Sequence, residues 1–153
     1  DGPDAQAVEA LMLQGYCELW AGRGDAARAT FERIVHATAQ SPTLLAGPGR
    51  EIRSYLALAY AGLGEKEKAL EHGRQAVADY KSDAVIGALA ERYLAEIEAH
   101  VGEVDAAIAR VARLLEVPRG IQPADLRLSP FWDPLRQDPR FQALVEHPSA
   151  VRY

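Results

Sequence analysis

Three stretches of this 153-residue chain repeat one pattern of small residues. A glycine is followed five residues later by an alanine in the pairs Gly22 and Ala27, Gly64 and Ala69, and Gly102 and Ala107. Another small residue precedes each alanine by twelve positions: Gly15, Ala57 and Ala95. Glycine readily takes the left-handed conformation that ends a helix, and small residues let two neighbouring helices approach closely. Self-similarity of this kind predicts stacked helical hairpins with a glycine at each turn.

The pattern resembles the tetratricopeptide repeat (TPR), which has a small residue and then an aromatic on its first helix and alanines on its second. The second stretch matches at Leu56, Ala57, Tyr60, Gly64, Ala69 and Ala76. The first stretch matches at Gly15, Gly22, Ala27 and Phe31, and the third at Leu94, Ala95, Gly102 and Ala107. Glu18 and Glu98 depart from the family, because they stand where it has an aromatic. The glycines are 42 and 38 residues apart, against about 34 for the family, which predicts longer connections between hairpins.

The resemblance implies an all-α fold: a right-handed superhelical solenoid of about three TPR-like hairpins with a C-terminal helical cap. We divide the chain into a linker over residues 1–4, hairpins over 5–118 and a proline-rich capping segment over 119–153. Helix caps and breakers predict helices over about 5–21, 25–39, 48–63, 66–80, 83–100 and 103–117, with Asp4 and Asp25 capping the first two. A loop containing proline and glycine is expected over 41–49.

The segment after Pro118 is punctuated by prolines. A capping residue precedes proline at Ser129-Pro130 and at Asp138-Pro139, which predicts short helices over about 130–136 and 139–146. The apolar side chains of this tail, Trp132 among them, are expected to close the open end of the solenoid. Residues 126–127, 130, 132–136 and 138–141 also resemble the segment that ends many bacterial proteins in which C-terminal repeats follow a kinase, cyclase-like or winged-helix module.

Composition excludes several classes of partner. The net charge of −5 disfavours direct binding of nucleic acid or of an anionic membrane surface. The apolar runs are too short to cross a bilayer, so no membrane insertion is expected. Without a signal peptide, we expect a cytoplasmic location. The opening Asp1-Gly2-Pro3-Asp4 indicates a piece cut from a larger protein.

The sequence offers no catalytic motif. The four histidines, His36, His72, His100 and His147, have no partner at metal-ligand spacing, and no phosphate-binding loop or nucleophile motif is present. We therefore expect no enzyme activity, no cofactor and no metal. The single cysteine, Cys17, cannot form an internal disulfide and is expected to be buried in an apolar helix.

In the TPR family the first helices line a concave groove. By register, the residues expected to contact a partner there are Glu9, Met12, Tyr16, Trp20, Arg53, Ser54, Arg92 and Glu96. Tyr16 and Trp20 would supply aromatic anchors, and the two arginines would bind an acidic group.

The resemblance thus implies a protein–protein interaction domain with a regulatory or scaffolding role in a larger bacterial signalling protein. Its partner would be a protein, a peptide or the upstream module of the same chain. The alternative is a sensor of a small ligand or short peptide that controls an upstream catalytic or DNA-binding module.

Overall fold

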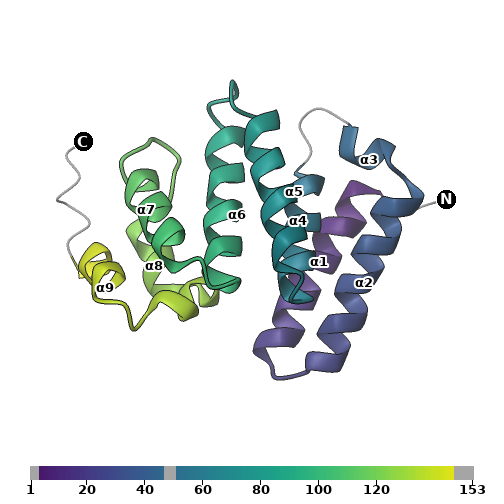
Figure 1. Cartoon of the computed structure of the whole chain (residues 1–153), viewed down its shortest axis with the longest axis horizontal. Helices are drawn as coiled ribbons and strands as arrows, with labels where there is room; N and C mark the ends of the chain where they lie inside the picture. The colour runs from purple at the N-terminus through teal and green to yellow at the C-terminus, as the bar shows by residue number, and fades with distance from the viewer. Residues whose placement is uncertain (1–3, 47–50, 147–153) are drawn as a thin grey trace. The chain divides into compact units, whose positions relative to one another are not determined.

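A computed structural model describes residues 4–46 and 51–146, and every regular element in those residues is a helix (Figure 1). The all-α prediction is confirmed for this part of the chain. The chain divides into two compact units after Asp79. This division falls between the second and third hairpins, inside the range 5–118 that the sequence assigns to the hairpins.

The first unit contains two helix pairs. Helix α1 (Ala5–Trp20) packs against α2 (Gly24–Gln40), and α4 (Ile52–Gly62) packs against α5 (Lys66–Asp79). Helix α4 also contacts α1 and α2, which joins the two pairs. The short helix α3 (Thr43–Ala46) lies in the segment predicted to be a loop. The predicted start of the third helix, at residues 48–50, lies outside the described residues.

The second unit contains one helix pair and the C-terminal segment. Helix α6 (Ile86–His100) packs against α7 (Val104–Leu114). The chain continues through α8 (Pro123–Leu128), the 3-10 helix η1 (Pro130–Leu135) and α9 (Pro139–Glu146). The two helices predicted in the tail are confirmed, and α8 is an additional element that the sequence analysis missed.

One turn geometry recurs in all three helix pairs of the described residues. Gly22, Gly64 and Gly102 have φ values of 74°, 78° and 86°. The N–H of Gly22 donates to the Leu19 carbonyl at 3.0 Å, and the next N–H, of Arg23, donates to the Glu18 carbonyl at 2.9 Å. The other two turns have the same pair of bonds. These bonds satisfy carbonyls at the end of the first helix, so the predicted role of the glycines is confirmed.

The core of the first unit contains a buried aromatic ring set between two glycines. Phe31 of α2 is fully buried, and its ring lies where a Cβ atom on either Gly15 or Gly62 would collide with it. Gly15 belongs to α1 and Gly62 ends α4, so the Phe31 ring contacts both neighbouring helices. The repeated small residue at position 15 therefore makes room for an aromatic side chain.

The C-terminal segment shares a core with the last helix pair. Trp132, Leu135 and Phe141 are buried in one cluster with Val111 and Leu114 of α7. The rings of Trp132 and Phe141 lie with their centroids 6.4 Å apart. The predicted packing of the tail against the third hairpin is confirmed by this cluster.

Two local predictions are wrong. Cys17 is exposed, because successive residues of a helix point about 100° apart and the buried face of α1 includes its neighbours Tyr16 and Glu18. Asp25 lies inside the first turn of α2, which begins one residue earlier, and Arg23 occupies the capping position. Asp4 does cap α1, since its Oδ1 accepts a hydrogen bond of 2.8 Å from the N–H of Ala7.

Candidate functional site

The residues predicted to line a groove fall into three groups by exposure. Four are buried, with 1–4% of their surface exposed: Met12, Tyr16, Ser54 and Glu96. Two are exposed: Glu9 and Trp20. Two are partly buried and already paired: Arg53 with Asp79, and Arg92 with Glu96 and Asp125.

The expectation of surface exposure is wrong for the four buried residues. Tyr16 illustrates the reason, because its hydroxyl donates to the Leu58 carbonyl at 2.9 Å and its ring packs edge-on against Phe31. A side chain held in this way stabilises the fold and cannot contact a partner unless the core opens. Glu9 and Trp20 are exposed, and the ring of Trp20 also packs against Tyr16 with centroids 5.6 Å apart.

One position links the two helices of every hairpin in the described residues. In each hairpin, the residue four positions before the turn glycine contacts the residue that follows it by twelve positions. The hydroxyl of Thr30 donates to Glu18 at 2.7 Å, the ring of His72 stacks on Tyr60 with centroids 5.4 Å apart, and Arg110 binds Glu98. Glu18 and Glu98, which depart from the family pattern, thus occupy equivalent places and join α1 to α2 and α6 to α7.

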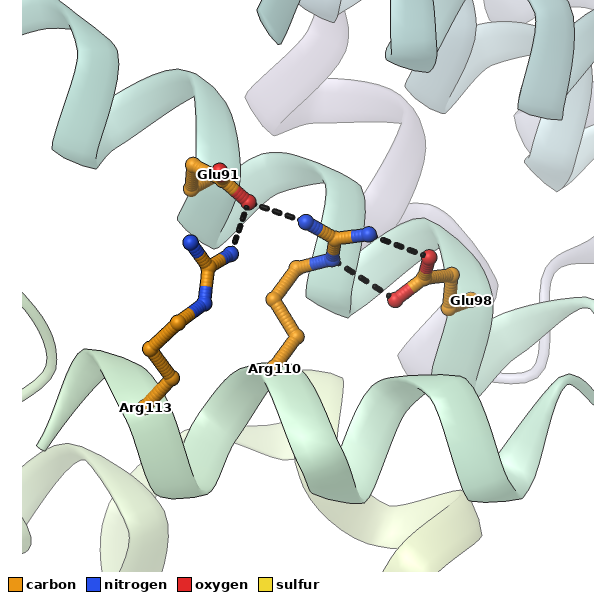
Figure 2. A network of polar contacts seen from close by, with 4 residues as sticks. All are labelled: Glu91, Glu98, Arg110 and Arg113. Atoms are coloured by element: carbon orange, nitrogen blue, oxygen red, sulfur yellow. Dashed lines mark hydrogen bonds and ion pairs between the residues drawn. The ribbon is translucent and has the colours of Figure 1, made fainter.

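Figure 2 shows that the link in the third hairpin is part of a larger ionic network. The guanidinium of Arg110 binds both carboxylate oxygens of Glu98 at 3.0 Å and also contacts Glu91. Arg113 binds the same oxygen of Glu91 at 2.7 Å. Burial acts to raise the pKa of Glu91, but hydrogen bonds and charge from Arg113 and Arg110 lower it overall. The network holds α6 against α7. Because Arg110 binds both oxygens of Glu98, we interpret the role of the network as structural.

A second cluster joins α6 to α8. Arg92 donates to Glu96 at 3.1 Å and to Asp125 at 3.3 Å. Glu96 has 2% of its surface exposed, and its Oε2 atom has no hydrogen-bond partner among the described residues. Burial raises the pKa of Glu96 to about 7, although Arg92 acts in the opposite direction.

The candidate binding surface of the first unit is a depression along α2. It is open to solvent and has a volume of about 690 Å³. Its lining residues are Leu11, Ala29, Glu32, Arg33, His36, Ala37 and Gln40. The lining combines apolar side chains with charged, imidazole and amide groups, a composition that suits a protein surface better than a buried polar ligand. The sequence does not predict this surface, because TPR register places partner binding on the first helices and not on α2.

Other kinds of site find no support in the part of the chain that the structure describes. There, no group of three His, Cys, Asp or Glu side chains is arranged to hold a metal ion. None of the helices in residues 4–46 and 51–146 combines the length and the apolar character that crossing a membrane requires. No family model, curated protein or solved structure matches this chain.

Proposed function

We propose that this chain is a TPR-type helical domain that binds a protein or peptide, with no catalytic role of its own. The observation that carries the proposal is the threefold repetition of one hairpin, with the same glycine turn and the same contact twelve residues apart. Repeated hairpins stack into solenoids whose surfaces bind other proteins. This proposal includes the superhelical arrangement of the three hairpins.

The depression along α2 is the surface that we assign to partner binding. Ala29 and Leu11 offer apolar contact, and Arg33 and His36 offer hydrogen-bond donors beside it. A partner segment with an apolar anchor and an acidic side chain would bury the first against Ala29 and pair the second with Arg33. The net charge of −5 supports a partner other than nucleic acid.

The biological setting rests on resemblance alone. The tail residues around Trp132 resemble those that end bacterial regulatory proteins, which supports a cytoplasmic signalling or scaffolding role for the full-length protein. A sensor of small ligands is less well supported, because the depression is open and contains no tyrosine, tryptophan or phenylalanine to enclose one.

The test fills the depression while leaving the fold intact. Ala29→Arg places a long charged side chain on the exposed floor of the depression, whereas Ala39→Arg makes the same change on the same helix outside it. Proteins captured from a bacterial lysate by the unmodified chain should bind Ala39→Arg normally and Ala29→Arg at least about tenfold more weakly. Equal binding to both variants would exclude the α2 surface, and capture of no protein would count against the interaction function.

A further inference from the structure

One guanidinium group connects two carboxylates that come from different helices. Arg92 and Glu96 lie one turn apart on α6, and Asp125 lies in the first turn of α8. The Nε of Arg92 donates to Oε1 of Glu96 at 3.1 Å, and its Nη1 donates to Oδ2 of Asp125 at 3.3 Å. The same Asp125 oxygen accepts the backbone N–H of Gln122 at the start of α8, at 3.3 Å. Arg92 therefore holds the beginning of α8 against α6.

Glu96 is the member of this cluster whose charge is hardest to accommodate. Its side chain is buried, and within residues 4–46 and 51–146 its second oxygen has no hydrogen-bond partner. Burying an ionised carboxylate with one oxygen unsatisfied is unfavourable, whereas the protonated form carries no charge into the interior. Loss of the proton would also set Glu96 and Asp125 in competition for Arg92.

Several charged groups on the elements around α6 have other partners, and Arg127 of α8 is exposed. Arg110 of α7 binds Glu91 and Glu98, and Asp133 of η1 pairs with Arg136. His100 lies one turn beyond Glu96 on α6, and burial lowers the pKa of its imidazole. The charges that act on Glu96 are those of Arg92 and Asp125.

We propose that Arg92, Glu96 and Asp125 form a pH-responsive contact, in which loss of the proton from Glu96 weakens the attachment of α8 to α6. This inference is independent of the partner-binding function. The contact would make the conformation of the C-terminal segment depend on pH near neutrality, so that a change of buffer or compartment would alter it.

The direction of the response follows from proton linkage. Burial raises the pKa of Glu96 from 4.5 to about 7 in the folded protein. The folded chain then keeps this proton at pH values where the unfolded chain has released it. The stabilisation from this group is fully present below the unfolded pKa and is lost as the pH rises through the folded one. His100 contributes in the opposite sense, because a lowered histidine pKa costs stability as the pH falls.

A comparison of variants of the whole chain isolates the contribution of Glu96. Glu96→Gln reproduces the neutral side chain permanently, and Glu116→Gln makes the same change at an exposed position of the same unit. Between about pH 5.5 and pH 8, the unfolding equilibrium constant of the unmodified chain should rise about 30-fold relative to that of Glu96→Gln, as the shift from 4.5 to about 7 requires. Glu116→Gln should follow the unmodified chain, and His100 cancels from the comparison because every variant retains it.

Two further readouts locate the effect, and the first of them, the titration of Glu96, needs only the unmodified chain. The carboxyl carbon of Glu96 in the unmodified chain should titrate near pH 7 by NMR, and Asp125→Asn should move this midpoint downward, because the Asp125 charge raises it. Amide exchange in α8 at pH 8 should be faster in the unmodified chain than in Glu96→Gln. A Glu96 midpoint near its ordinary value of 4.5, or equal α8 exchange in the two chains, would overturn the proposal.

Discussion

At the scale of single residues, the turn glycines are required for their backbone conformation and not for lack of space. Gly64 has φ at 78°, and a Cβ atom there would meet nothing within 4 Å. Gly64→Ala should therefore destabilise the chain by about 1 kcal/mol, the cost of a left-handed conformation for alanine. Gly64→Asn should cost less, because asparagine tolerates this conformation better. Chemical denaturation measures both changes.

Gly24 provides the matched control for this prediction. It also has open space around its missing Cβ, but it lies in the first turn of α2 without a positive φ. Gly24→Ala should be neutral or slightly stabilising, because alanine is the better helix former. A Gly64→Ala variant that is as stable as Gly24→Ala would show that the turn does not need its left-handed residue.

The sequence predicted backbone roles better than side-chain exposure. The spacing of small residues sufficed to identify the turn glycines, because a left-handed helix end leaves a local signal. Exposure depends on which neighbour a helix face meets, and the sequence does not state that. Tyr16 was expected on a surface and lies in the core, while Cys17, one residue later, was expected in the core and is exposed.

At the scale of helices, the ionic network of Figure 2 holds α6 against α7. Glu98 is buried and both its oxygens bind Arg110, whose side chain is 20% exposed. Arg110→Met would leave a buried carboxylate without its partner, a change that costs about 3–5 kcal/mol in protein interiors. The partial exposure of Arg110 favours the lower end of this range. The free energy of unfolding, measured in denaturant, tests it.

Arg113→Met is the control within the same network. Arg113 is 57% exposed and binds only Glu91 at the edge of the cluster. A surface pair of this kind contributes about 0–1 kcal/mol, so the loss should be much smaller than for Arg110→Met. Equal losses for the two variants would mean that burial of Glu98 does not determine the strength of the clamp.

Helix boundaries could be predicted from the sequence to within a few residues, and α8 shows where the method failed. This helix begins at Pro123, a position where proline is compatible with a helix start, but proline also signals a break in a helix, so the sequence does not predict α8. Asp125 accepts the N–H of Gln122 three residues earlier, a local contact that stabilises a helix start. A carboxylate three residues after a polar cap position was the signal available. The contacts that join the two helices of a hairpin through residues twelve positions apart could not be predicted from the sequence. Glu18 and Glu98 make such contacts, but they stand where the family pattern has an aromatic residue.

At the scale of the whole molecule, the C-terminal segment belongs to the same compact unit as the third hairpin. The change of composition at residue 118 predicts a boundary there. The structure joins both sides of that position through buried side chains such as Val111, Leu126 and Trp132. Composition reports which residue types are frequent in a local segment, whereas a compact unit is defined by contacts between segments far apart in the sequence.

Trp132 tests whether this second unit depends on its tail. The indole is fully buried in the cluster shared with α7, so Trp132→Ala should destabilise the chain by about 3–5 kcal/mol. Trp20→Ala removes the same side chain from a site that is 41% exposed, and should cost roughly 1 kcal/mol.

Because Trp132 lies in the second unit, hydrogen exchange in Trp132→Ala should accelerate more in α6, α7 and α9 than in α1, α2 and α4. A cost below about 0.5 kcal/mol would show that the tail does not stabilise the hairpin, given the cost of emptying a buried site. Uniform acceleration across all helices would show that the two units unfold together, even though each is compact by itself.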